Sequence, residues 1–136
     1  PEPFNPLAVS IALDAPFVAR SFAGDIEQTQ SIIREAIAFK GFALVDVLQP
    51  CVVFNHLNTY QWFREHSCAL PAGHDPSERL AAMHLALQEE PRVLGVLYRH
   101  DARACYEDLA MLPERPLYLH QGPGAEQVKR MLDAYR

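Results

Sequence analysis

The sequence is poor in cysteine and lacks long apolar runs, and each shortage argues against a class of protein. Its three cysteines, Cys51, Cys68 and Cys105, are an odd number at wide spacing. Small secreted domains instead carry dense, even-numbered sets of disulfide-forming cysteines, so we expect the reducing cytoplasm. No run of about 18 apolar residues is present, and the sequence therefore predicts no membrane-spanning helix and no membrane partner.

Basic residues are also too few and too scattered for a nucleic-acid-binding protein. Twelve lysines and arginines oppose 17 aspartates and glutamates, which gives a formal net charge of −5. Proteins that bind nucleic acid usually concentrate positive charge on one surface, because phosphate contacts supply most of the affinity. The charge distribution predicts no nucleic acid partner.

The composition is that of a folded globular domain. The chain has 136 residues, of which 49% are hydrophobic and 21% are charged, and we expect one domain over residues 1–136. The first residues, from Pro1 to Pro6, contain no initiator methionine and no signal peptide. We interpret the sequence as a piece of something larger.

A strand–helix–strand pattern predicts an α/β fold. Residues 17–20 are β-prone, and Asp25 is placed to cap a helix over about residues 26–39, which Gly41 ends. Residues 42–48 are almost entirely apolar, which is typical of a strand covered on both faces in a parallel sheet. We expect the two strands to be parallel neighbours joined by the helix, because βαβ units have this arrangement.

The remaining elements follow from capping signals and apolar patterns. A polar cap followed by proline predicts helix starts at Asn5 and at Asp75, the second with Glu78 in a capping box. Three more elements are expected: a short helix capped by Asn58 or Thr59, a strand at residues 92–98, and a last helix over about residues 125–135.

Glycine-rich phosphate-binding loops are absent. Neither GxGxxG nor GxxxxGK[ST] occurs. Gly122-Pro123-Gly124 is the nearest approach, but the proline removes one of the amide groups that a phosphate would need, so a connecting turn is the better interpretation. The sequence predicts no nucleotide-binding loop.

The segment after residues 42–48 gathers groups that could carry chemistry. His56, His66 and Cys68 are zinc-ligand types, but their spacing matches no standard zinc site. Cys51 lies just past the predicted strand end, where α/β folds often place functional groups. It is either a nucleophile that His56 could activate, or a small buried hydrophobic residue.

Two segments carry distinctive sequence elements: residues 41–55 contain Leu-Gln-Pro-Cys-Val, and residues 58–62 are Asn-Thr-Tyr-Gln-Trp. Both elements resemble the β subunits of 2-oxoacid:ferredoxin oxidoreductases. The similarity covers about residues 3–100 in order and spacing. These are thiamine-diphosphate and iron–sulfur enzymes. The resemblance implies the three-layer, parallel-sheet fold that binds thiamine diphosphate. The chain would be the carboxy-terminal part of such a subunit, with residues 101–136 as a tail that matches less closely.

The family's activity is the oxidative decarboxylation of a 2-oxoacid with coenzyme A to an acyl-CoA, with electrons passing to ferredoxin. In the family the cysteine of Leu-Gln-Pro-Cys is a ligand of a [4Fe–4S] cluster, and the resemblance implies this role for Cys51. The motifs that supply the other cluster ligands, and that hold Mg²⁺ and the diphosphate, are absent here. We therefore expect this chain alone to bind no thiamine diphosphate, Mg²⁺ or cluster, to be inactive by itself, and to contain no catalytic residue.

The partners implied by the resemblance are the amino-terminal half of the β subunit, the α subunit and ferredoxin. Surfaces that such partners cover should be apolar, and Tyr60, Trp62 and Phe63 are candidates unless they pack on their own sheet. Two other functions remain open. One is a non-catalytic α/β interaction module, and the other is a transferase or hydrolase that uses Cys51 and His56.

Overall fold

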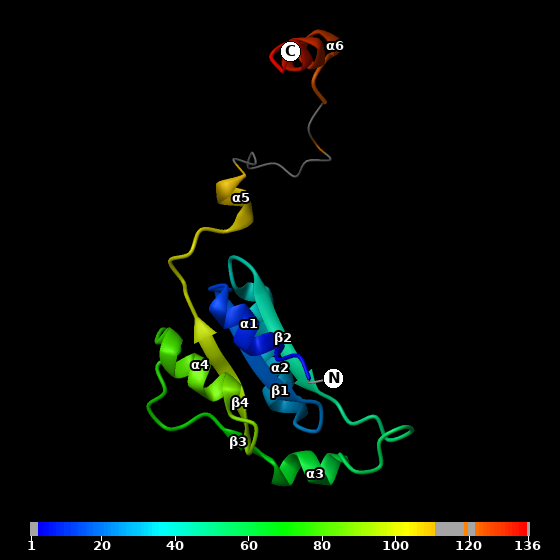
Figure 1. Ribbon diagram of the computed structural model, residues 1–136, viewed down its shortest axis with the longest axis vertical. Helices are drawn as coiled ribbons and strands as arrows, with labels where there is room; N and C mark the ends of the chain where they lie inside the picture. The colour runs from blue at the N-terminus through cyan, green and yellow to red at the C-terminus, as the bar shows by residue number, and fades with distance from the viewer. Residues whose placement is uncertain (1–2, 111–118, 120–121, 136) are drawn as a thin grey trace. The chain divides into compact units, whose positions relative to one another are not determined.

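The computed structural model describes residues 3–110, 119 and 122–135. The chain divides into two compact units, Pro1–Cys105 and Tyr106–Arg136 (Figure 1). Within the described residues, no helix is both long enough and apolar enough to cross a membrane.

The first unit follows the predicted alternation of strands and helices. Its elements in chain order are α1 (Pro6–Ala12), β1 (Phe17–Phe22), α2 (Ile26–Ala38), β2 (Ala43–Leu48), α3 (Tyr60–Glu65), β3 (Ser67–Ala69), α4 (Arg79–Leu87) and β4 (Arg92–Arg99).

The four strands form one sheet in the order β2-β1-β4-β3. β1 and β2 are parallel and in register from Phe17 opposite Ala43 to Phe22 opposite Leu48, which confirms the predicted βαβ unit. β4 runs antiparallel to β1 and parallel to β3, so the sheet is mixed where a wholly parallel one was expected. An apolar strand pattern reports burial and carries no information on strand direction, which explains the difference.

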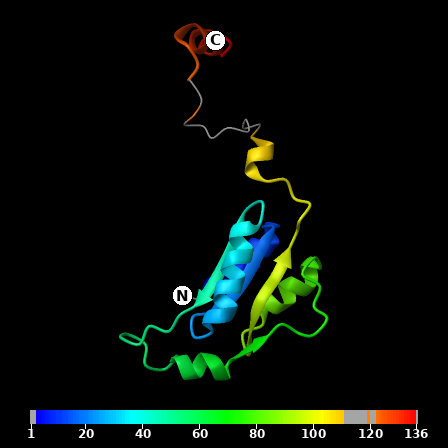
Figure 2. The ribbon, with the colours of Figure 1, turned by 180° about the vertical axis from the view of Figure 1, so that it is seen from behind.

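Helices cover both faces of the sheet, giving three layers (Figures 1 and 2). On one face, α1 and α4 pack on β1 and β4 through a cluster of buried side chains. On the other face, Ile32 of α2 packs on Phe17 and Ala19. Every residue of β1 is buried, so this strand is the centre of the unit.

β2 is an edge strand, paired among the described strands with β1 alone. The prediction that it is covered on both faces is not met among the residues that the structure describes, since most residues of β2 are half-buried. Val47 is 38% exposed, and Phe42, just before the strand, is 61% exposed. The apolar composition of β2 therefore exceeds what its surroundings in this chain require.

Three helix starts form as predicted. Asn5 Oδ1 accepts from Ala8 N at 3.0 Å, and Asp25 Oδ1 accepts from Gln28 N at 3.0 Å. Thr59 Oγ1 accepts from Trp62 N at 3.2 Å. Each bond satisfies one of the amide groups that the first turn of a helix leaves without an internal partner.

The predicted start at Asp75 is wrong. α4 begins at Arg79, and Glu78 precedes it without a side-chain capping bond. Asp75 instead accepts from both the amide and the hydroxyl of Ser77, at 2.9 and 2.8 Å. An aspartate can close a turn on its own backbone as readily as it caps a helix, and the sequence pattern does not separate the two.

The second unit contains the short helix α5 (Tyr106–Leu109) and α6 (Ala125–Asp133). α6 lies where the last helix was predicted, and Gly124 immediately precedes it. Gly122, Pro123 and Gly124, where a connecting turn was expected, form an irregular segment that leads into α6.

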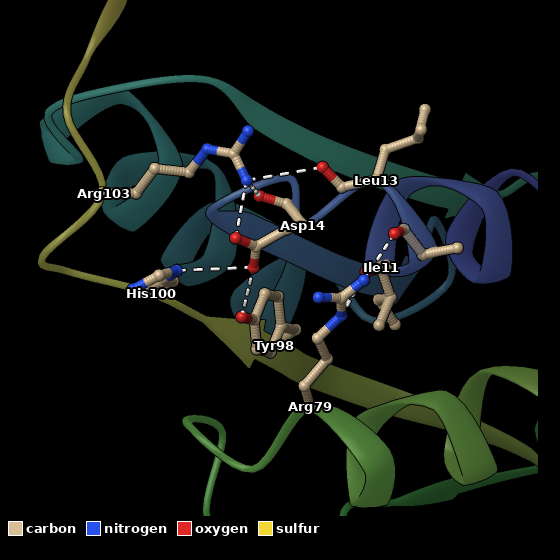
Figure 3. A network of polar contacts seen from close by, with 8 residues as sticks. Ile11, Leu13, Asp14, Arg79, Tyr98, His100 and Arg103 are labelled. Atoms are coloured by element: carbon tan, nitrogen blue, oxygen red, sulfur yellow. Dashed lines mark hydrogen bonds and ion pairs between the residues drawn. The ribbon is translucent and has the colours of Figure 1, made fainter.

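A polar network centred on Asp14 joins the end of α1 to β4 (Figure 3). Tyr98 donates its hydroxyl hydrogen to Asp14 Oδ1 at 2.5 Å, and His100 Nδ1 lies 3.4 Å from the same oxygen. Arg103 forms an ion pair with Asp14 Oδ2 at 2.6 Å. Asp14 has a φ of 58°, a left-handed conformation that aspartate tolerates better than most residues. The hydrogen bond from Tyr98 is the main reason that the pKa of Asp14 lies below its ordinary value.

Two arginines complete the network by satisfying backbone carbonyls at the end of α1. Arg79 donates from Nε to Ile11 O at 3.0 Å and from Nη2 to Ala12 O. Arg103 donates to the carbonyl of Asp14. The last carbonyls of a helix have no internal partners, so these bonds fix where α1 stops and β1 begins.

We predict that Asp14→Asn lowers the free energy of unfolding by about 1–3 kcal/mol at pH 7, because charge-assisted hydrogen bonds are replaced by neutral ones. Asparagine keeps the left-handed backbone accessible. Because the pKa of Asp14 is lowered in the folded state, the carboxylate stabilises the fold fully above the unfolded pKa. This contribution is lost as the pH falls through the lowered value.

Denaturant titrations at neutral and acidic pH test this prediction. The difference between wild type and Asp14→Asn should shrink with acidification. Asp25→Asn removes the same charge and keeps a helix cap, so it should have little effect. A wild-type advantage that does not depend on pH would contradict the assigned role of the carboxylate.

Candidate functional site

Cys51 lies three residues past the end of β2, as predicted. Pro50 is buried and Cys51 is exposed, so the alternative of a small buried hydrophobic residue is wrong. The carbonyl of Cys51 accepts from Phe54 N at 3.3 Å and from Asn55 N at 2.8 Å. Cys51 therefore opens a tight turn that anchors its backbone and leaves its thiol facing solvent.

The turn lies at the carboxyl ends of the two parallel strands. β1 and β2 end together at Phe22 and Leu48, and Ala23 N donates to Leu48 O at 3.0 Å. In α/β folds, loops at this edge of a sheet are where ligands and functional groups usually lie. The parallel pairing of β1 and β2 thus places Cys51 at a favourable position for chemistry.

Residues 51–57, which we call the cysteine loop, expose large apolar side chains. Phe54 is 88% exposed and Leu57 is 83% exposed, and Val52 and Val53 are also exposed. Single exposed apolar residues are common, but a contiguous group beside a functional residue typically marks a surface that another molecule covers.

Asparagines give the cysteine loop its shape. Asn55 Oδ1 accepts from the amides of Leu57 and Asn58, both at 3.0 Å. Asn55 Nδ2 donates to Asn58 Oδ1 at 2.9 Å. The polar residues of this segment therefore organise the backbone, while its apolar residues face outward.

The aromatic residues of α3 are neither free nor fully buried. Phe63 packs on Phe22 with ring centroids 5.8 Å apart, and Tyr60 lies 5.9 Å from the same ring. Tyr60 remains 39% exposed, and Trp62 and Phe63 are half-buried. The helix thus packs on its own sheet, which was one of the two alternatives, and still presents aromatic surface. The alternative of a partner interface stays a prediction.

The two other chemistries considered for this region lack the required contacts. Among the described residues, no group of three histidines, cysteines or carboxylates could hold a metal ion, so His56, His66 and Cys68 form no zinc site. His66 instead stacks on Trp62 with ring centroids 4.1 Å apart, and its Nε2 lies 3.2 Å from Glu90 Oε1. No hydrogen bond joins Cys51 to His56 in the part of the chain that the structure describes, so nothing in the geometry activates the thiol.

Comparisons with known proteins agree on one family. A model of the C-terminal region of the pyruvate ferredoxin oxidoreductase β chain matches residues 51–112. The chain is 30% identical to a 2-oxoacid:ferredoxin oxidoreductase β subunit of a Sulfolobus species over 93% of its own length and 45% of that protein. It is 33% identical to the β subunit of 2-oxoacid:ferredoxin oxidoreductase 1 of Aeropyrum pernix over 90% of its length and 42% of that protein.

A solved structure gives the same result. The 2-oxoglutarate:ferredoxin oxidoreductase of Magnetococcus marinus, with 2-oxoglutarate, coenzyme A and succinyl-CoA bound, matches 96% of this chain and 45% of its own. The TM-score is 0.78 at 31% sequence identity. The chain belongs to the β-subunit family of the 2-oxoacid:ferredoxin oxidoreductases. It spans somewhat less than half the length of these relatives.

Membership of the β-subunit family confirms the resemblance inferred from the motifs around Cys51.

The sequence analysis did not identify one pair of polar residues in the sheet. Arg20 and Asp46 lie opposite each other in β1 and β2, and Arg20 Nε donates to Asp46 Oδ2 at 2.8 Å. The sequence did contain a signal for this pair. Each of the two strands predicted to be parallel neighbours carries one charged residue, and buried charges are usually paired.

We predict that the three thiols of this β-subunit homologue react in the order of their exposure. Cys51 is exposed, Cys68 is half-buried and Cys105 is buried. A thiol reagent under native conditions should therefore label Cys51 first, as mass spectrometry can follow. Cys51→Ser should abolish the fast phase and Cys68→Ser should keep it. A fast phase that survives in Cys51→Ser would contradict the loop geometry.

Proposed function

We propose that this chain is the carboxy-terminal part of the β subunit of a 2-oxoacid:ferredoxin oxidoreductase. This enzyme oxidatively decarboxylates a 2-oxoacid with coenzyme A to an acyl-CoA and passes electrons to ferredoxin. Family membership supports the assignment, as do the 2-oxoglutarate, coenzyme A and succinyl-CoA bound to the Magnetococcus marinus relative. The observation that carries the proposal is the exposed Cys51 in an apolar loop at the carboxyl edge of the sheet.

Cys51 is proposed to be one ligand of a [4Fe–4S] cluster in the complete enzyme. An exposed thiol on an anchored turn is free to coordinate iron, and the neighbouring valines and phenylalanine can shield a cluster from water. The described residues hold no group of three ligands, so the remaining thiolates would come from outside this chain. When bound, such a cluster supplies one-electron transfer. The role of this chain is to present one thiolate from a stiff backbone.

Thiamine diphosphate and Mg²⁺ fit this chain poorly. The sequence lacks an acidic–glycine motif that could hold the metal and the diphosphate, and the described residues form no cluster of metal ligands. We therefore assign these cofactors to the complete enzyme and no catalytic step to residues of this chain. We expect the chain to be inactive alone.

The partner surface of the chain is proposed to include β2 and the cysteine loop. Among the described strands, β2 is paired on one edge only. Phe42 before the strand and Val47 within it are exposed, and the loop adds Phe54 and Leu57. We assign this surface to the polypeptide that corresponds to the rest of the β subunit, because the matched relatives are more than twice as long. The α subunit and ferredoxin are the further proposed partners.

Cys51→Ser tests the proposed ligand in the complete enzyme. We expect this variant to lose or convert the cluster and to lose ferredoxin reduction, because serine is a poor replacement for a thiolate. Iron content, the electron paramagnetic resonance spectrum and ferredoxin reduction are the measurements. Cys68→Ser and Cys105→Ser should retain the cluster and the activity. A normal cluster spectrum in Cys51→Ser would refute the assignment and favour the interaction module.

Leu57→Ser tests the proposed partner surface. Leu57 and Leu80 are both 83% exposed, but Leu80 lies on α4, away from the cysteine loop in the sequence. We expect Leu57→Ser to weaken binding of the remaining β-subunit polypeptide about tenfold or more, since burial of one leucine contributes about 1.5–3 kcal/mol. Leu80→Ser should have little effect. Surface plasmon resonance measures the affinity of both variants for that polypeptide. An equal loss of affinity in Leu57→Ser and Leu80→Ser would argue against this surface.

A further inference from the structure

A cavity that the proposed cluster does not use lies on the opposite side of β1 from α2. It has a volume of about 380 Å³. Its wall is formed by the segment around Asn5, by Arg20 and Asp46 of the sheet, by residues 88 and 89 after α4, and by Arg92 at the start of β4. This volume lies within the range of about 300–1,000 Å³ that is common for small-molecule sites.

Arg20 brings a buried and incompletely bonded cation to this cavity. Its side chain is only 9% exposed, and Nε is committed to Asp46 Oδ2. The two terminal nitrogens donate no hydrogen bond to any described residue. Neither terminal nitrogen is among the described side-chain atoms that are buried without a partner, so both remain accessible from the cavity. A ligand there can replace water as their acceptor, and a hydrogen bond to a charged donor is stronger than one between neutral groups.

Arg92 is the second cation in the wall. Its guanidinium carbon lies 5.3 Å from the centroid of the Trp62 ring, and that ring stacks in turn on His66. Its side chain forms no ion pair and no hydrogen bond with the described residues. The aromatic ring can hold the guanidinium plane in place while leaving its donors free.

The neutral polar groups of the wall are already occupied. Asn5 donates from Nδ2 to Ala86 O at 2.9 Å and accepts from Ala8 N. Gln88 donates from Nε2 to Pro91 O at 2.7 Å. The donors left for a ligand therefore belong to Arg20 and Arg92, and a group that accepts from two cations is an anion.

We propose that this cavity binds a compact oxyanion, the carboxylate or phosphate group of a small molecule, through Arg20 and Arg92. Asp46 balances the charge of Arg20, and Glu89 lies exposed at the rim, so the site favours an anion of low charge. This proposal does not depend on the function proposed for Cys51.

Nuclear magnetic resonance titration of the 136-residue chain tests the site. Inorganic phosphate and acetate are added separately at constant ionic strength, and the side-chain Nε–Hε signals of Arg20 and Arg92 are followed. We expect a saturable shift of both signals with at least one probe. Phosphate binding alone indicates a phosphate-bearing ligand, and acetate binding alone indicates an organic acid.

Variants decide whether the arginines form the site. Arg92→Gln should weaken binding at least about tenfold, the loss expected for a charge-assisted hydrogen bond. Arg20→Lys keeps the charge opposite Asp46 but removes the planar fork, and should also weaken binding. Arg34→Gln, which removes an exposed arginine of α2, should leave the affinity unchanged. The proposal is overturned if neither probe gives a saturable shift, or if Arg92→Gln binds as the wild type does.

Discussion

The first unit of this protein depends on the complete burial of β1. This strand is paired on both edges, by β2 and by β4, and covered on both faces by helices. All six of its residues are buried. The network around Asp14 closes the turn that leads into β1 and ties it to the far end of β4. The position of the strand is thus set by packing along its length and by charge at its start.

The candidate site is a consequence of that central strand. Because β2 is parallel to β1, both strands end at the same edge, and the chain leaves the sheet there as the cysteine loop. Asn55 provides the hydrogen bonds that a sheet or helix would otherwise supply. The loop can therefore keep a defined shape while its apolar side chains face outward. Such an arrangement stabilises little within this chain and suits a surface that is buried on assembly.

Local signals in the sequence were sufficient to predict the βαβ unit and to identify the family. The caps at Asn5, Asp25 and Thr59 depend on contacts within four residues, and such contacts can be inferred from residue type and spacing. The motif around Cys51 is similarly local. These local features were readable without coordinates.

Features that depend on distant residues could not be read in this way. The direction of β4 and the edge position of β2 follow from which strands meet in space. Asp75 carries the same signal as a helix cap, yet it bonds to Ser77 in a turn. The pairing of Arg20 with Asp46 required the register of two strands 26 residues apart in sequence. For the strand arrangement and for the Arg20–Asp46 pair, tertiary contacts decided the outcome. For Asp75, two local structures share one sequence signal.

The stacking of Trp62 has a practical consequence for spectroscopy. Trp62 is the single tryptophan of the chain, and its ring contacts both the imidazole of His66 and the guanidinium of Arg92. Its ultraviolet emission therefore originates from one known place, on α3 beside the start of β4. Emission intensity and wavelength thus provide an intrinsic optical signal for the surroundings of Arg92, without any attached dye.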